Sequence, residues 1–335
     1  MNSSPISPRL RATRGFAALS VSALVLAGCG SDPGADPAAA GSGDADAISV
    51  LATTTVWGDI ARQVVSCAGT GEVTTLMPVG ADPHDYSPSA QDVAQMVGAD
   101  LVIANGLGLE GGLTSSLASA AQDGATVFEV APLLDPIPFG GHTDGASAGD
   151  ASAEAGQDHE GEDPHVFHDV ARVATAAQLI GAKLTELSGD AAFTTCGDTL
   201  RDELMTVDAQ VAAILAEVPA DRRILVTDHD ALGYLADAYG YTVAGTVIPG
   251  GSTMAAPSSA ELAALAGTIR QTGVPAIFAN TADSQVLVDA LAAEVGEVEV
   301  VALFVGSLGG PGSGAQDYQG MVTTNAQRIS TALGG

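Results

Sequence analysis

The stretch of sequence that decides the fold is residues 48–76, which read ISVLATTTVWGDIARQVVSCAGTGEVTTL. Its two ends, Ile48 to Ala52 and Val73 to Leu76, are short runs rich in β-branched residues, which is typical of buried strands. Between them, Val56 to Ser66 has the spacing of apolar residues that indicates an amphipathic helix. A helix of this length is sufficient for the right-handed crossover between two parallel strands. The stretch therefore predicts a β-α-β unit of a parallel sheet.

The same alternation of strands and helices continues outward from this unit. In the first half it predicts strands at Leu101–Ala104 and Thr126–Glu129, with helices near Ser89–Val97 and Gly112–Ala120. In the second half it predicts strands at Ile224–Thr227, Thr242–Val247, Ala276–Ala279 and Val298–Leu303, with helices at Ala231–Tyr239, Ser258–Gln271, Ser284–Val295 and Gln316–Leu333. This alternation indicates the α/β class. Because 335 residues exceed the usual size of a single core, we expect two lobes.

The middle of the chain joins these two halves. Residues 136–163 read as an acidic, His-containing loop, and the chain from Gly197 to residue 218 has no further Gly and no Pro. We therefore expect residues 189–218 to form a long rigid helix that joins a first (βα) lobe, residues 47–188, to a second one, residues 219–335. Parallel sheets bind ligands beyond the carboxyl ends of their strands, so the expected site lies in the cleft between the lobes.

Residues 1–28 have the order of a lipoprotein signal peptide. Three arginines precede an apolar run, Phe16 to Ala27, that is too short to span a bilayer. The run ends in LAGC, residues 26–29, which resembles the lipobox of bacterial lipoproteins, where the Cys is acylated. We expect Cys29 to anchor the chain on the outer face of the cell membrane, with residues 29–46 as a flexible tether. Ordinary cleavage beside an incidental Cys is the alternative.

The charge and the remaining cysteines narrow the class of protein further. The formal net charge is −29, from 40 acidic and 11 basic residues, and such a surface repels phosphate backbones. Nucleic acid is therefore excluded as a partner. Besides Cys29 the chain has only Cys67 and Cys196. Since exported thiols rarely stay reduced, we predict a disulfide between them, with two buried thiols as the alternative.

Three of the six histidines lie where a ligand site is expected. His84 lies in a turn-rich segment after a predicted strand, and His229 lies just after the predicted strand Ile224–Thr227, at the start of a helix. His165 repeats the Asp-Pro-His order at the end of the acidic loop. A single His in such a place is usually a hydrogen-bonded residue. Three together favour a metal site, because neutral imidazoles suit zinc and leave one position of a tetrahedron open.

These residues resemble the cluster A-I, or cluster 9, substrate-binding proteins of zinc and manganese ABC importers. Members share Asp-Pro-His-Xaa-Tyr-Xaa-Pro-Ser, which Asp82 to Ser89 match, and Asp-Pro-His-Val-Trp, which Asp163 to Phe167 resemble. A third block, His-Asp-Ala-Xaa-Xaa-Tyr, resembles His229 to Tyr234. The resemblance covers residues 48–333. It implies two (βα) lobes joined by a rigid long helix, and its metal ligands fall on His84, His165 and His229.

The sequence departs from this family at the fourth ligand. Members often supply a carboxylate in a Val-Asp-Ser-Leu-like segment, where this chain has Gly306, which has no side chain to coordinate an ion. Zinc-binding relatives use a Glu after Ile-Phe-Xaa, where this chain has Asn280. A water or Asp283 is expected to complete the shell. Asp82 is expected to orient His84, although an Asp in a turn usually bonds its own backbone.

The other three histidines have weaker predictions. His142 and His159 lie among acidic residues of loop 136–163, which resembles the His- and acid-rich loops of zinc-specific relatives. Metal capture by this loop and a solvated flexible insertion are both open interpretations. His168, three residues after His165, is expected either to support a ligand or to lie at the surface.

These features predict an extracytoplasmic lipoprotein that is a monomer and not an enzyme. It is expected to capture Zn(II) as cargo and deliver it to the permease of an ABC importer. A third His, in place of the Glu of many manganese-binding members, favours Zn(II) over Mn(II). An exported zinc hydrolase or hydratase with an open three-His site is the rival class, and a metal-linked surface adhesin is also compatible with the fold. The sequence has neither an HExxH base nor a Ser nucleophile elbow.

Overall fold

Two parallel four-stranded sheets organise the computed structural model, which describes residues 47–139, 161–296 and 298–334. The strands of the first sheet are β1 (Ser49–Ala52), β2 (Glu72–Thr75), β3 (Leu101–Ala104) and β4 (Val127–Glu129). Their order is β2-β1-β3-β4, with all neighbours parallel. The chain therefore leaves β1 in one direction and later returns to its other side. The carboxyl ends of β1 and β3 lie at this change of direction, where open α/β sheets bind ligands.

The second sheet repeats this topology. Its strands are β5 (Ile224–Thr227), β6 (Thr242–Thr246), β7 (Ala276–Asn280) and β8 (Glu299–Leu303). Their order is β6-β5-β7-β8, again with all neighbours parallel. The predicted pair of parallel α/β lobes is thus confirmed.

The helices begin and end at residues that the local sequence favours. The first lobe contains α1 (Thr55–Ala68), α2 (Ala90–Gly98) and α3 (Thr114–Gln122), and the second contains α6 (Gly233–Tyr239), α7 (Ser259–Thr272), α8 (Val286–Val295) and α9 (Tyr318–Ala332). Ser89 and Ser258 each form a capping box, with Asp92 and Glu261 respectively, which satisfies free N–H groups of α2 and α7. Short 3-10 turns lie at Gly111–Leu113, Ala131–Leu133, Val166–His168 and Ala220–Arg222.

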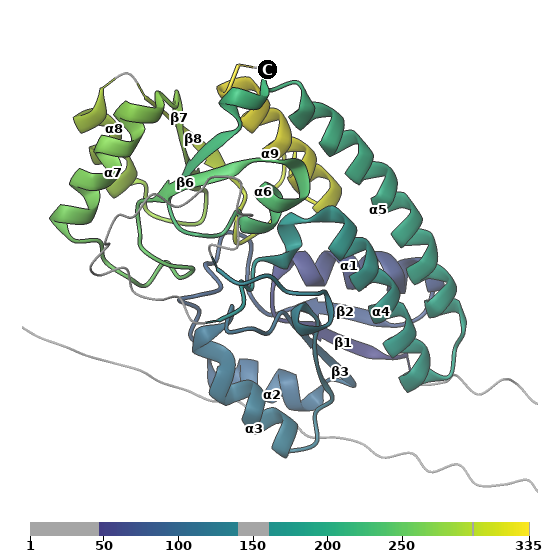
Figure 1. Ribbon diagram of the computed structural model, residues 1–335. Helices are drawn as coiled ribbons and strands as arrows, with labels where there is room; N and C mark the ends of the chain where they lie inside the picture. Colours follow the sequence, from purple (N-terminus) through teal and green to yellow (C-terminus); the bar gives the residue numbers. More distant parts are fainter. Residues whose placement is uncertain (1–46, 140–160, 297, 335) are drawn as a thin grey trace, which may run out of the picture. The chain divides into compact units, whose positions relative to one another are not determined.

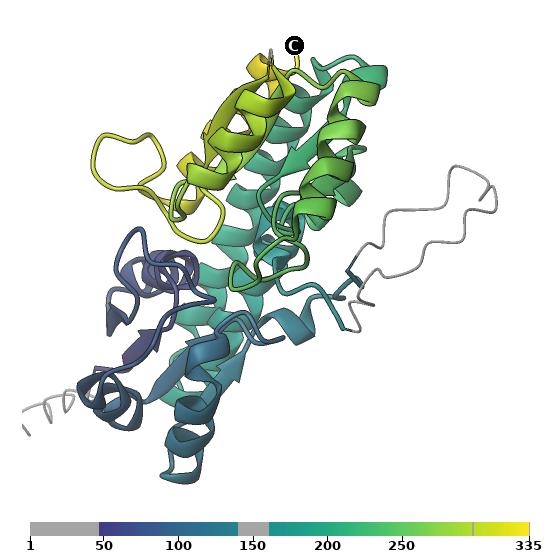
Figure 2. The ribbon, with the colours of Figure 1, turned by 90° about the vertical axis from the view of Figure 1, so that its left-hand side faces the viewer.

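Two long helices join the lobes. Helix α4 (Val170–Ser188) precedes α5 (Ala192–Ala216), whose 25 residues span about 37 Å at 1.5 Å per residue. Figures 1 and 2 show α5 running alongside both lobes, and it contacts α1 and α4 as well as α9 of the second lobe. Helices α4 and α5 approach closely, because a Cβ on Gly197 would lie only 2.7 Å from the Ala177 carbonyl oxygen.

A disulfide fixes this long helix to the first lobe. Cys67 on α1 and Cys196 on α5 are bonded, with their Cα atoms 5.8 Å apart. The predicted pairing is therefore confirmed. The first-lobe end of α5 cannot move independently of α1.

One hydrophobic cluster continues through both lobes. It includes Trp57 of α1, Phe193 of α5, Phe278 of β7 and Tyr318 of α9, all of them buried. Two further clusters lie beneath the outer helices, one against α2 and α3 and the other against α7 and α8. This shared cluster contains residues from both sides of positions 188 and 219. The boundaries predicted at these positions, between the first lobe, the linking helix and the second lobe, therefore stay predictions.

None of the helices in the described part of the chain has the length and apolarity needed to cross a membrane. The predicted signal peptide, Cys29 and the tether lie outside the described residues, as do His142 and His159.

Candidate metal centre

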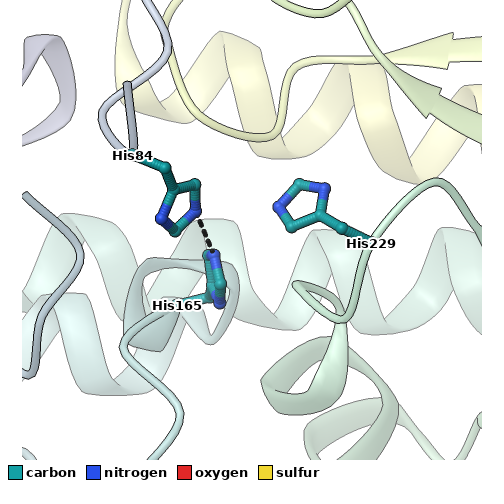
Figure 3. Close-up of side chains that lie close together, drawn as sticks. All are labelled: His84, His165 and His229. Carbon is teal, nitrogen blue, oxygen red and sulfur yellow. Dashed lines mark hydrogen bonds between the residues drawn. The ribbon is translucent and has the colours of Figure 1, made fainter. Parts of the chain in front are cut away.

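The three histidines singled out in the sequence converge from three separate segments. His84 lies in the connection between β2 and α2, His165 directly precedes the turn Val166–His168, and His229 follows β5 by one residue. His84 and His229 are therefore held beyond the carboxyl ends of strands in different sheets. Figure 3 shows the three rings turned toward one another.

The distances between the rings fit a common ion. Nε2 of His84 and Nε2 of His165 are 3.2 Å apart, and the three pairs of ring centroids are separated by 5.3, 5.6 and 5.4 Å. One ring nitrogen from each residue lies within 4.8 Å of the other two. Two nitrogens bound to one tetrahedral Zn(II) at about 2.0–2.1 Å lie about 3.3 Å apart. The His84–His165 pair already has this spacing.

Two aspartates orient two of the rings. The Oδ1 atom of Asp163 lies 2.7 Å from Nδ1 of His165, and Oδ1 of Asp228 lies 2.9 Å from Nδ1 of His229. A carboxylate in this position accepts a hydrogen bond from Nδ1–H. This fixes the tautomer and leaves the lone pair on Nε2 free to bind a cation. Sequence reasoning did not assign these roles. The acidic residue one or two positions before each His was the available signal.

Burial keeps the imidazoles of His84 and His165 neutral. His165 and His229 are each 1% exposed, and His84 is half-buried. Burial, together with the neighbouring rings of His165 and His229, lowers the pKa of His84 to about 3. Burial and His229 also hold the pKa of His165 well below its usual value. Burial acts to lower the pKa of His229 as well, but the hydrogen bond and charge of Asp228 outweigh it and raise that pKa.

The predicted supporting residues lie around this group but have different contacts. Asp82 accepts the backbone N–H of His84 on Oδ1 at 2.9 Å and the hydroxyl of Thr253 on Oδ2, so it fixes the turn and not the ring. Asn280 donates from Nδ2 to Oδ2 of Asp283 at 3.0 Å. Burial and the nearby charge of Asp82 raise the pKa of Asp283 to about 6. Asp283 belongs to a second group with Asp228 and His229, within 4.8 Å of one another.

The segment around Gly306 connects the two lobes beside the histidines. The hydroxyl of Ser307 accepts the Gly80 N–H at 2.9 Å, and Leu308 N–H donates to Oγ1 of Thr55 at 2.9 Å. A Cβ on Gly306 would lie 2.9 Å from Cδ of Pro83. Pro83 therefore occupies the space in which a side chain at position 306 would begin.

A buried network holds the segment that carries His165. Asn105, directly after β3, donates to the Pro164 carbonyl at 2.9 Å and accepts from Trp57 Nε1 at 2.9 Å. Glu110 accepts the backbone N–H of Asn105 at 2.7 Å and is 3% exposed. Sequence reasoning missed this network, although a polar residue at the end of a buried strand was a usable signal.

His168 is buried, which contradicts the surface alternative for this residue. It is 3% exposed, and its Nε2 atom has no hydrogen-bond partner among the described residues. Burial, with the charges of His165 and His229, lowers its pKa to about 3. The carbonyl of the preceding residue, Phe167, accepts a hydrogen bond from the Tyr318 hydroxyl at 2.9 Å. This turn therefore contacts the second lobe.

Comparison with known proteins identifies relatives along nearly the whole chain. The family described as zinc-uptake complex component A, periplasmic, matches residues 50–332. The zinc-binding protein TroA of Treponema pallidum (strain Nichols) is 32% identical over 304 residues, which cover 88% of this chain and 92% of TroA. The manganese-binding lipoprotein MntA of Bacillus subtilis (strain 168) is 28% identical over 329 residues, covering 95% and 98%. The structure of periplasmic TroA superposes with a TM-score of 0.73 at 30% identity, covering 86% of this chain and 99% of that one.

Proposed function

The chain belongs to the family of periplasmic component A of zinc-uptake complexes, and we propose that it captures Zn(II) outside the cytoplasm and delivers it to an ABC importer. The observation that carries this proposal is the convergence of His84, His165 and His229, with one nitrogen of each within 4.8 Å of the others. The three segments are far apart in the chain, and packing alone gives no reason for their imidazoles to meet. A cation shared by the three rings gives such a reason.

Zinc is the proposed cargo because of the ligand type. Neutral imidazoles suit zinc, whereas manganese prefers carboxylate and water oxygens. The burial that lowers the pKa of His84 and His165 keeps both rings able to bind a cation. TroA, the relative at 32% identity, is named a zinc-binding protein. Mn(II) is the second candidate, since MntA, at 28% identity, is named a manganese-binding lipoprotein.

The proposed location and partners follow from the amino terminus and the relatives. The lipobox-like residues 26–29 support acylation of Cys29 and attachment to the outer face of the membrane. Relatives such as MntA are named lipoproteins, which agrees with this anchor. We propose that the chain acts as a monomer that docks on the permease of its importer. The lobes would close around the ion and reopen there.

Metal analysis tests the cargo. Metal-free protein is titrated with Zn(II) and with Mn(II) by calorimetry, beside the His229→Ala variant. We expect one tightly bound Zn(II) per chain, weaker Mn(II), and loss of tight binding in the variant. Absence of tight zinc binding to the unmodified protein would overturn the proposal.

A separate assay tests the rival enzymatic function. The three-His group also resembles the ligand set of catalytic zinc, which keeps one position open for water. The zinc-loaded protein is therefore assayed for ester hydrolysis and for hydration of CO₂. Turnover that disappears in His229→Ala would favour the hydrolase or hydratase over the binding protein.

A further inference from the structure

The three histidines leave one position of a tetrahedral zinc shell to fill, and four aspartates lie close enough to be considered. Three of them are already engaged. Asp163 and Asp228 each accept a ring and a backbone hydrogen bond from their own His on Oδ1. Asp82 accepts the His84 backbone on one oxygen and the Thr253 hydroxyl on the other. Redirecting any of these carboxylates would release the backbone or ring that it holds.

Asp283 differs from these three. Its Oδ2 atom accepts one hydrogen bond, from Asn280 Nδ2 at 3.0 Å, and its Oδ1 atom has no hydrogen-bond partner among the described residues. The residue lies in the connection between β7 and α8, and its side chain is half-buried. A carboxylate with one fixed and one available oxygen is arranged to take a ligand without further loss of contacts.

Asp283 lies near Gly306, the position at which the resembled family often carries a carboxylate ligand. A Cβ on Gly306 would lie 2.9 Å from Pro83 and 3.6 Å from Nδ2 of Asn280. The same Asn280 amide holds the Asp283 carboxylate. The carboxylate of Asp283 therefore lies next to the space that a side chain at position 306 would enter. The connection after β7 supplies the charge that the segment after β8 lacks.

Asp283 lies close to one of the three histidines, His229. A carboxylate oxygen of Asp283 and a ring nitrogen of His229 lie within 4.8 Å. Ligands of one tetrahedral zinc lie about 3.3 Å apart, and Asp283 is grouped with His229 but not with His84 and His165, so its free oxygen must turn toward these two rings. The two side-chain torsions of Asp283 are the bonds about which it would turn. Asp82 and Asp228 also face this carboxylate, so a divalent cation would relieve the repulsion among the three.

We propose that Asp283 is the fourth ligand, giving a three-nitrogen, one-oxygen site that selects Zn(II) over Mn(II). This inference rests on the proposed function. A single carboxylate oxygen completes a tetrahedron, which suits zinc. The site would offer manganese too few oxygen ligands, because manganese prefers octahedral coordination by carboxylates and waters.

The test compares Asp283→Asn with the matched control Asp85→Asn. Asp85 is exposed, directly follows His84 and loses the same charge on substitution. Zinc affinity is measured by chelator competition on the full chain, and melting of the metal-free forms checks folding. We expect Asp283→Asn to weaken zinc binding about 100-fold or more, because even groups behind a metal ligand account for about 10–100-fold. The Asp85→Asn variant should stay within about threefold of the unmodified protein.

The outcomes separate this inference from the proposed function. If the unmodified protein binds zinc tightly and Asp283→Asn binds as well as Asp85→Asn, only the assignment of Asp283 is overturned. If the unmodified protein binds no zinc, the proposed function itself fails. A zinc-bound crystal structure gives an independent readout: an Asp283 oxygen at about 2.0–2.2 Å from the ion supports the assignment, and a water at that place contradicts it.

Discussion

Asp228 accepts two hydrogen bonds from the residue that follows it, one from the backbone N–H of His229 at 2.8 Å and one from its ring Nδ1 at 2.9 Å. Its second oxygen accepts the backbone N–H of Asn280, at the end of the neighbouring strand β7. One carboxylate thus ties the ring of His229 to two strands of the second sheet. The direction of Nε2 follows from the sheet and not from a free side-chain torsion.

Replacing Asp228 by Asn is expected to weaken zinc binding by about 10–100-fold, because the variant loses the charge, and its single oxygen cannot accept from both His229 and the Asn280 backbone. Chelator competition measures the change. Asp237→Asn, on the exposed side of α6, is the control, since it removes the same charge from the same lobe. Equal affinities of the two variants would show that Asp228 does not orient the ligand.

His168 should make the stability of the metal-free protein depend on pH. Its pKa is lowered to about 3 in the folded chain from 6.5, so below pH 6.5 the unfolded chain binds a proton that the folded chain does not. The stability that the protein has with His168 neutral is fully present above pH 6.5, and it is lost as the pH falls toward 3. From this residue alone, the free energy of unfolding should fall by about 1.4 kcal/mol per pH unit.

The variant His168→Gln removes this titration. Denaturant unfolding of both metal-free proteins at several pH values between 6 and 4 measures the difference. We expect the two curves to diverge, with the flatter one belonging to the variant. Parallel curves would mean that His168 also titrates normally in the folded chain.

Reduction of the Cys67–Cys196 disulfide should destabilise the fold without removing the metal site. The bond closes a loop with a sequence separation of 129 residues. Chain-entropy arguments give about 4–5 kcal/mol for a loop of this length, with strain and residual structure lowering the measured value. Denaturant unfolding of the Cys67→Ser, Cys196→Ser double variant measures this loss. Neither cysteine lies among the histidines, so zinc stoichiometry should be unchanged, and its loss would contradict the assignment of a purely structural role.

The sequence was sufficient for elements whose signal is local. The strand Leu101–Ala104 and the strand Ile224–Thr227 have the predicted bounds, because a short run of apolar and β-branched residues has few alternatives in an α/β chain. The histidines were also identifiable, since His84 lies in a turn-rich segment, His165 ends a loop and His229 follows a strand. Their convergence on one ion was expected from the family resemblance and not from their spacing. It depends on the relative placement of two sheets, which no spacing along the chain encodes.

The hydrogen-bond partners of the residues that tune the site could not be identified from the sequence. Asp82 was expected to orient the ring of His84, but it bonds the backbone of that residue and the Thr253 hydroxyl of the other lobe. Asn105 supports His165 through the Pro164 carbonyl across 59 positions of the chain. Such long-range hydrogen bonds follow from the packing of the lobes. Only the structure reveals them.

Thr55 should control the local opening of residues 306–308, the segment of the second lobe that is hydrogen-bonded to the first lobe. Its Oγ1 atom accepts the backbone N–H of Leu308 at 2.9 Å and lies 3.3 Å from Oγ of Ser307. Thr55→Val keeps the shape but leaves the buried Leu308 N–H without its acceptor, at a cost of about 1–3 kcal/mol. We expect amide hydrogen exchange to accelerate at Leu308, with a smaller change at Val226 in the core of the second sheet. The control, Thr175→Val on α4, removes an exposed hydroxyl that bonds only its own helix. Unchanged exchange at Leu308 in Thr55→Val would show that this hydrogen bond does not hold the two lobes together.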